Sequence, residues 1–229
     1  MTAFLRNSII TIFVFISFFA FQVKAETHYK AHISVGGHAG MAMSRMSFSP
    51  EVPQSWQLGP TFGVQVRYAE EKLVGVMAEL NFVNRGWKEN FDNSELNYSR
   101  SLSYICLPIM THINFGSPRF KCFVNLGPEF GLMIANSISS NFDYRNPGVL
   151  LPSTRRVNQM SADIKNKFDY GITAGLGAEM YLNPRNSVYI EGRFYYGLGN
   201  IYPSSKADEF SASRSMTITV TAGYNFRIK

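Results

Sequence analysis

Residues 168–182 alternate strictly between apolar side chains and side chains that are polar, small or amphipathic. Apolar residues take every second position from Phe168 to Leu182, and the positions between them are polar, small or amphipathic. A period of two is typical of a β-strand whose two faces meet different surroundings. Strands of soluble sheets usually have about five or six residues, whereas a tilted strand that crosses a bilayer needs about 9–11. We therefore predict a membrane-spanning strand with its apolar face toward lipid.

The same alternation recurs along the chain and predicts further strands at about 29–41, 62–68, 74–82, 104–115, 120–132, 188–198 and 216–226. No charged residue falls on the apolar face of any of these strands. A charge on that face at mid-bilayer costs about 2–4 kcal/mol, which explains the exclusion. The predicted fold class is all-β: an eight-stranded antiparallel up-and-down transmembrane β-barrel.

The predicted connections fall into two classes, short and long, which alternate along the chain. Tight turns are expected at 69–72, 116–119 and 183–186, and long polar loops at 43–59, 84–100, 135–166 and 199–214. Outer-membrane barrels have short periplasmic turns and long external loops. Both termini of the barrel are therefore expected in the periplasm.

The first residues of the chain show a different pattern. Arg6 precedes a largely apolar run at 9–21, and Val23-Lys24-Ala25 follows it, which is typical of a secretory signal peptide cleaved before Glu26. A membrane anchor is the alternative, but the run is shorter than the about 20 residues that a spanning helix needs. We expect a signal peptide at 1–25 and one barrel domain at 26–229. Loss of Arg6 and Lys24 would lower the net charge from +6 to +4, which gives no indication of nucleic-acid binding.

Several segments together resemble the small PorT-like barrels of the porin family in the outer membrane of Bacteroidota. The segments that carry the resemblance are AELNFVNRGW at 78–87, YICLPIMTHI at 104–113, FVNLGPEFG at 123–131, FDYGITAGLG at 168–177, EGRFYYGLGNI at 191–201 and the C-terminal GYNFRIK. Cys106 departs from the pattern, because an acidic residue is expected before the Leu-Pro pair. The resemblance implies an outer-membrane barrel, and it implies no particular activity.

Charged residues on the inner face are expected to form a structural ion network. An eight-stranded barrel is just wide enough for its side chains to fill the interior. With a turn centred near Arg185, Glu179 faces Glu191, and Arg193 lies between them on the same face. Two inward carboxylates are also compatible with acid–base chemistry, but buried charges need partners, so we favour a network that plugs the lumen.

The histidines and cysteines give little indication of a metal or catalytic site. Of the four histidines, His28, His32, His38 and His112, the first two are about 13 Å apart along one strand. His112 lies on a different strand, and neither His-x-His nor CxxC spacing occurs. No metal or cofactor is therefore expected. The two cysteines are predicted on opposite faces and far out of register, so we expect no disulfide.

The long loops are the remaining candidates for function, because rigid scaffolds commonly present binding residues on loops. The candidate contacts are Trp56, Trp87, Arg145, Arg155 and Arg156. The basic loop 135–166 is expected to meet lipopolysaccharide phosphates or a protein partner, although solvated charge is an equally good explanation. We expect a non-enzymatic outer-membrane protein with a plugged lumen and a structural or surface-interaction role. A small-solute porin is the alternative, and an outer-membrane lipid hydrolase is the third candidate.

Overall fold

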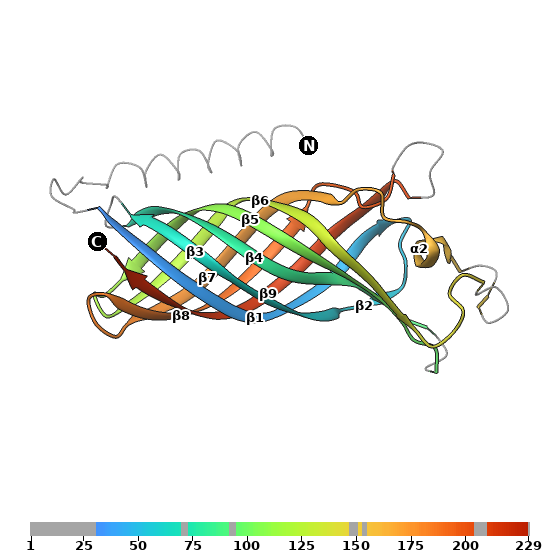
Figure 1. Ribbon diagram of the computed structural model, residues 1–229, viewed down its shortest axis with the longest axis horizontal. Coiled ribbons are helices and arrows are strands. Elements are labelled where there is room, and N and C mark those ends of the chain that lie inside the picture. Colours follow the sequence, from blue (N-terminus) through green and yellow to red (C-terminus); the bar gives the residue numbers. More distant parts are fainter. Residues whose placement is uncertain are drawn as a thin grey trace, which may run out of the picture. The chain divides into compact units, whose positions relative to one another are not determined.

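The computed structural model describes residues 31–69, 73–91, 95–146, 151–152, 155–203 and 210–228. Residues 31–229 form one compact unit (Figure 1). Its elements are β1 (His32–Ser49), β2 (Gln54–Ser55), β3 (Gln57–Ala69), β4 (Val74–Glu89), β5 (Tyr98–Gly116), β6 (Phe120–Ser140), α2 (Asn158–Ser161), β7 (Phe168–Tyr181), β8 (Asn186–Gly197) and β9 (Ala212–Arg227). The expected signal peptide and His28 lie outside the described residues.

Eight long strands pair antiparallel with their neighbours and close into a barrel. The order around the barrel is β4-β3-β1-β9-β8-β7-β6-β5, and pairing of β4 with β5 closes the ring, for example at Met77 opposite Met110. The short strand β2 extends the edge of β4 through Gln54 and Ser55. Every long strand lies beside its neighbours in the sequence, except where β1 and β9 join the two ends. The predicted up-and-down eight-stranded topology is therefore confirmed.

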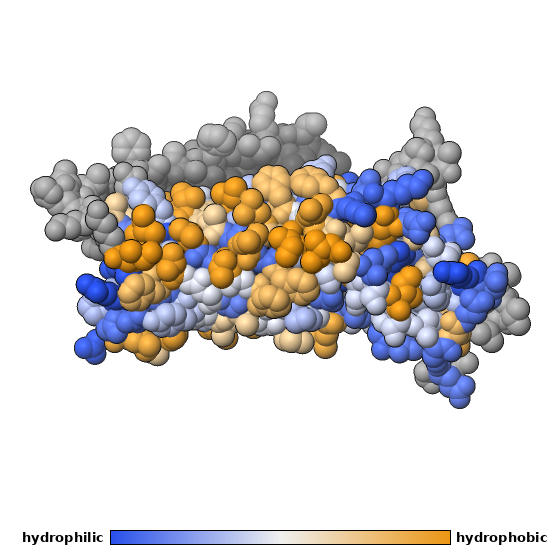
Figure 2. Space-filling view, in the orientation of Figure 1, coloured by the Kyte–Doolittle hydropathy of each residue, from blue (hydrophilic) through white to orange (hydrophobic). Residues whose placement is uncertain are grey.

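An apolar belt covers the outer wall of this barrel. Most of the residues predicted to face lipid are exposed, and Leu176 is the most open of them at 71%. Others, such as Val35 and Ile218, are half-buried. Figure 2 shows these apolar side chains along the barrel wall, with polar residues gathered beyond them at the end that carries α2. The residues predicted to face inward, such as Met77, Tyr104 and Phe123, are buried. In the described part of the chain, no helix is long and apolar enough to span a membrane.

The strands continue past this belt into segments that the sequence pattern predicts as loops. Strand β1 runs on to Ser49, β4 to Glu89, and β5 begins at Tyr98. In these extensions the alternation is inverted, because Phe48 and Trp87 point inward while Arg45 and Lys88 lie on the outer side. Outside the belt a barrel wall meets water, so its apolar residues turn to the interior as in a soluble protein. The predicted boundaries at 43, 84 and 100 were therefore wrong.

The two ends of the barrel differ, and we call them the short-turn end and the long-loop end. The turns at 117–119 and 182–185 define the short-turn end, where Arg227 N also donates to Arg185 O at 2.7 Å and Ile228 N to Ile33 O at 2.8 Å. Both described ends of the chain therefore lie at the short-turn end. The connections that contain β2 and α2 lie at the long-loop end (Figure 1).

Candidate functional site

The lumen nearest the short-turn end holds an arginine–glutamate pair. Arg67 Nη1 of β3 contacts Glu179 Oε2 of β7 at 2.8 Å, and both side chains are buried. Glu179 also accepts hydrogen bonds from Ser187 Oγ and from Asn225 Nδ2. The carboxylate thus has partners from three different strands, as a charge removed from water requires.

The middle of the lumen holds one arginine between two carboxylates. Arg193 of β8 contacts Glu79 of β4 through Nη1 at 2.6 Å and Nη2 at 2.9 Å. It also contacts Glu191 through Nη2 at 2.8 Å and Nε at 3.2 Å. Asn81 Nδ2 donates to Glu79 at 2.7 Å, and Asn125 Nδ2 donates to Glu191 at 2.9 Å. This arrangement ties opposite walls of the barrel together across its axis.

A third arginine lies closer to the long-loop end. Arg85 Nη2 of β4 forms an ion pair with Glu129 of β6, and Arg85 Nη1 lies 3.5 Å from Asp169 Oδ2 of β7. The guanidinium also lies 4.0 Å from the ring centre of Tyr195. The three arginines therefore pair with five carboxylates at three successive levels of the lumen.

The predicted network is present only in part. Arg193 does contact Glu191, but its second carboxylate is Glu79, and Glu179 pairs with Arg67 instead. The expected register was wrong by two residues, because Tyr181 pairs with Ser187 and Gly177, rather than Glu179, lies opposite Glu191. The alternation alone does not assign Glu79 and Arg67 to this network, because their contacts cross the lumen between strands that are not paired.

Small residues on the inner wall give space to large ones. A Cβ atom at Gly175 would collide with the carboxylate of Glu191, and one at Gly177 would collide with the ring of Phe123. The inner glycines are thus covered by neighbouring side chains and do not leave an open path at these levels. Such pairing of small with large residues is the usual way in which narrow barrels are filled.

A small cavity lies between Arg85 and Arg193. It is lined by His38, Asn81, Arg85, Arg193 and Thr217, among others, and its volume is about 20 Å³. That volume accommodates about one water molecule. It is too small for a nutrient or other organic solute.

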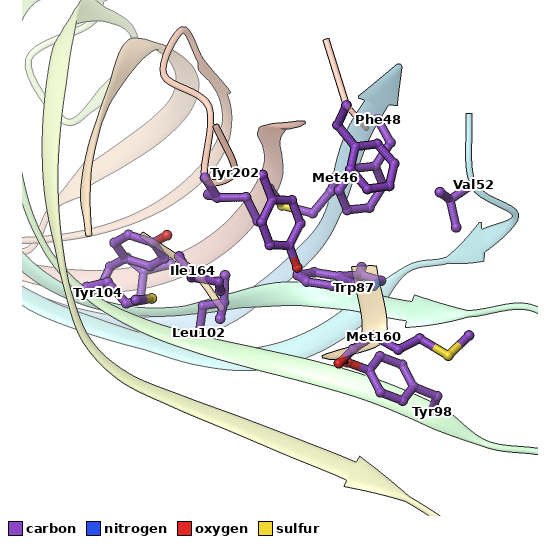
Figure 3. Packing of buried hydrophobic residues seen from close by; sticks show 14 of the residues in the cluster. Met46, Phe48, Val52, Trp87, Tyr98, Leu102, Tyr104, Met160, Ile164 and Tyr202 are labelled. Atoms are coloured by element: carbon purple, nitrogen blue, oxygen red, sulfur yellow. The ribbon is translucent and has the colours of Figure 1, made fainter. Parts of the chain in front are cut away.

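An apolar cluster fills the barrel interior at the long-loop end (Figure 3). We call it the mouth core, and its members include Met46, Phe48, Val52, Trp87, Tyr98, Leu102, Met160, Ile164, Tyr202 and Phe210. Within this cluster, the ring centre of Phe48 lies 5.5 Å from that of Trp87 and 5.2 Å from that of Phe210. Because strands and loops both contribute, this cluster fixes the long loops to the barrel wall.

Part of the loop between β6 and β7 enters the mouth core, and we call residues 155–164 the plug segment. Its helix α2 presents Gln159 and Met160, which are fully buried. Tyr98 Oη donates to Met160 O at 2.7 Å, and Arg100 Nη1 donates to Ala162 O at 2.7 Å. The backbone carbonyls of the plug segment are thus satisfied by side chains of the barrel wall.

A second set of polar contacts holds the plug segment through the side chains of Arg155 and Gln159 and the backbone of Gln159. Gln159 Nε2 donates to Glu89 Oε1 at 2.8 Å, and Arg155 Nη2 pairs with Glu89 Oε2 at 3.1 Å. Tyr202 Oη donates to Gln159 O at 2.9 Å and accepts from Arg100 Nη1 at 3.0 Å. Burial raises the pKa of Tyr202 to about 12, and the nearby Arg100 guanidinium opposes part of that effect. Tyr202 therefore stays protonated and able to donate at neutral pH.

The candidate loop contacts divide between the surface and the interior. Trp56 is 42% exposed beside the guanidinium of Arg45, and Arg145 and Arg156 are also exposed. Trp87, by contrast, is completely buried, and Arg155 is tied to Glu89. Neither of these two side chains is open to a partner while the mouth core is intact. The prediction of a surface contact at Trp87 was wrong, because the wall alternation is inverted at that level.

The described histidines are engaged in polar contacts of the inner wall. His112 Nδ1 lies 2.7 Å from Asn125 Oδ1, and His38 Nδ1 lies 3.3 Å from Tyr189 Oη. Among the residues that the structure describes, no group of three or more His, Cys, Asp or Glu side chains is arranged to hold a metal ion. Cys106 is a buried free thiol, and Cys122 is a partly exposed one on the outer wall.

A family model and several solved structures match this chain. The family model described as "Outer membrane protein beta-barrel domain" matches residues 22–202. No curated protein matches the chain. Outer membrane protein OprG from Pseudomonas aeruginosa is 11% identical, covers 86% of this chain and 95% of its own, and has a TM-score of 0.53.

Two further structures are similar at lower scores. Outer Membrane Protein W of E. coli is 16% identical, with 87% of this chain and 100% of its own covered and a TM-score of 0.44. Neisserial surface protein A is 14% identical, with 86% of this chain and 99% of its own covered and a TM-score of 0.43. The match of the family model, which extends over most of the sequence, agrees with the closed eight-stranded barrel and its apolar belt. The chain therefore belongs to the outer membrane protein β-barrel domain family and is an outer-membrane protein.

Proposed function

We propose that this protein is a closed, non-enzymatic barrel that presents a rigid surface for interaction at the cell exterior. The long-loop end faces outward and the termini face the periplasm, in line with the usual arrangement of short and long connections in such barrels. The three arginine levels and the mouth core form the scaffold that fixes the loops. The segments that resemble PorT-like barrels fit such a role, and we propose that subtype for the chain.

The observation that carries this proposal is the double closure of the lumen. Ion pairs of Arg193 with Glu79 and Glu191 cross the lumen at mid-height. The mouth core fills the barrel at the long-loop end. The small-solute porin alternative requires a continuous water path, and the cavity described between Arg85 and Arg193 has a volume of about 20 Å³. We therefore favour a surface role over transport.

The hydrolase alternative also has little support from the geometry. A serine hydrolase needs a histidine within hydrogen-bond reach of a serine and oriented by a third group. The described contact of His112 is instead with the amide of Asn125, and that of His38 is with the phenol of Tyr189. We propose that these histidines are structural.

The surface that meets a partner is expected to include the exposed candidates. Trp56 lies just before β3, and Arg145 is an exposed residue of the loop between β6 and β7. Aromatic and arginine side chains are enriched in protein interfaces. Lipopolysaccharide and a protein partner are the two proposed classes of contact for this surface.

A pull-down from outer membranes tests the proposal. The bait is intact protein, and the test variant is Trp56→Ala with Arg145→Ala, which leaves the plug segment and the mouth core in place. A control variant, Lys121→Ala, removes a positive charge at the short-turn end. We expect the test variant to lose partners that the intact protein and the control retain. Identical partner sets for all three proteins would contradict the proposed interaction surface.

A further inference from the structure

A groove lies at the long-loop end where β7 begins and β8 ends. Its volume is about 490 Å³, and it is open to the outside of the barrel. Lys165 and Lys167 line one part of it, and Phe168, Tyr170 and Leu198 line another. The groove therefore combines two cationic residues with an apolar wall.

The backbone around this groove is held by the barrel. Met133 N donates to Lys167 O at 2.8 Å, so the chain at Lys167 is tied to β6. Asn166 Nδ2 donates to Asn200 O at 2.7 Å and joins the two sides of the groove. Leu198 N donates to Tyr170 O at 2.8 Å. A groove fixed by these bonds does not depend on a loop that must be ordered on binding, which reduces the entropic cost of binding.

The apolar wall of the groove continues into the lipid-facing belt. Phe168 is 57% exposed, and Tyr170 and Leu198 are also open to the outside. Phe130 and Phe168 stack with ring centres 6.5 Å apart, and Tyr170 stacks on Phe168 at 6.2 Å. Aromatic girdles of this kind mark the boundary between the hydrocarbon core and the headgroups. The two lysines therefore lie at headgroup level, directly beside acyl chains.

We propose that this groove binds a phosphorylated, acylated glycolipid of the outer leaflet, the lipid A portion of lipopolysaccharide. The phosphate would lie against Lys165 and Lys167, and an acyl chain would follow Phe168, Tyr170 and Leu198 down the barrel wall. Charge complementarity and continuity with the lipid-facing belt both favour this occupant over a soluble anion. The choice of the outer leaflet rests on the orientation given under the proposed function.

Binding of defined lipids to purified protein in detergent tests this inference. The probes are bisphosphorylated lipid A, the same lipid without its phosphates, and inorganic phosphate, each titrated and followed by native mass spectrometry. We expect the bisphosphorylated lipid to bind most tightly, because only it satisfies both parts of the groove. The double variant Lys165→Ala with Lys167→Ala should bind it roughly 30-fold more weakly, at about 1 kcal/mol for each lysine.

A matched control removes the same charge at the short-turn end. Arg119→Ala with Arg185→Ala changes two exposed basic residues that do not line the groove, and its lipid A affinity should equal that of the unmodified protein. A third variant, Leu198→Ser, should weaken the acylated probe and leave any binding of inorganic phosphate unchanged. Heat-modifiable electrophoretic mobility verifies that each variant is folded. Equal affinity of the groove variant and the control, or equal binding of lipid with and without phosphates, would overturn the inference.

A separate measurement keeps this result distinct from the proposed orientation. Arg145→Cys in intact cells should react with a membrane-impermeant thiol reagent if the long-loop end is external. Labelling together with a failure of the lipid A assay would refute the groove inference and leave the orientation standing. Lipid A binding without labelling would instead refute the orientation.

Discussion

Replacement of Arg193 by methionine should strongly destabilise the barrel. The guanidinium lies between the carboxylates of Glu79 and Glu191 and makes four contacts of 2.6–3.2 Å with them. Both carboxylates are buried, so Arg193→Met would leave two negative charges in the lumen without their common cation. Breaking a buried ion pair by removing one partner typically costs about 3–5 kcal/mol. We expect the free energy of unfolding to fall by an amount in that range.

A neutral triple variant separates the loss of the ion pairs from the loss of packing. Arg193→Met combined with Glu79→Gln and Glu191→Gln removes all three charges and keeps the side-chain volumes similar. Replacement of a whole buried ion network by neutral groups is often neutral or stabilising. The triple variant should therefore be much closer to the unmodified protein than the single variant is.

Urea unfolding in lipid vesicles measures the difference. Tryptophan fluorescence reports on the transition, because Trp87 is buried in the mouth core and Trp56 is partly exposed. The single variant should show a lower midpoint with an unchanged slope, which indicates a change in stability alone. A single variant as stable as the unmodified protein, or a triple variant as unstable as the single one, would refute the role assigned to Arg193.

Three further predictions concern the outer wall, the thiols and the mouth core. Leu176→Arg should reduce insertion into liposomes relative to Leu176→Met, because a charge near mid-bilayer costs about 2–4 kcal/mol; equal yields would contradict the lipid-facing assignment. In folded protein Cys122 should react with a small maleimide well before Cys106, and mass spectrometry after denaturation should show both labelled; a two-dalton deficit would indicate a disulfide. The pKa of Tyr202 is raised from 10.0 to about 12, so its stabilising effect is full below pH 10 and is lost as the pH rises toward 12. Tyr202→Phe should reduce the loss of stability between about pH 10 and 12, measured as the free energy of unfolding over a pH series. An unchanged pH dependence would refute the burial of the Tyr202 hydroxyl group.

The alternation of the sequence predicts the barrel well because a lipid bilayer imposes one rule on every strand. Within the belt, each outward residue must be apolar, so facing and strand number follow directly from the pattern. The same rule fails between the apolar belt and the long-loop end. There Phe48 and Trp87 point inward and the outer side of the wall meets water. The rule for lipid-facing strands therefore assigns these two residues to loops. A change of phase between two alternating segments of one strand is the signal that would have located this boundary.

The ion network was less predictable, for two physical reasons. A register error of two residues keeps each side chain on its correct face but changes its neighbour, as the pairing of Gly177 with Glu191 shows. Contacts across the lumen, such as those from Arg193 to Glu79, join strands whose relation depends on the whole barrel geometry. The plug segment is also beyond a pattern-based prediction, because its burial depends on contacts with distant wall residues such as Tyr98.

The conductance of the purified protein in a planar bilayer tests the closed lumen most directly. The crossed lumen at Arg193 and the mouth core around Trp87 and Met160 predict a flat current trace for the unmodified protein. A double variant, Trp87→Ala with Met160→Ala, should loosen the plug segment and raise the frequency of brief current steps. Reproducible open steps from the unmodified protein would contradict the closed lumen and would support a small-solute porin instead.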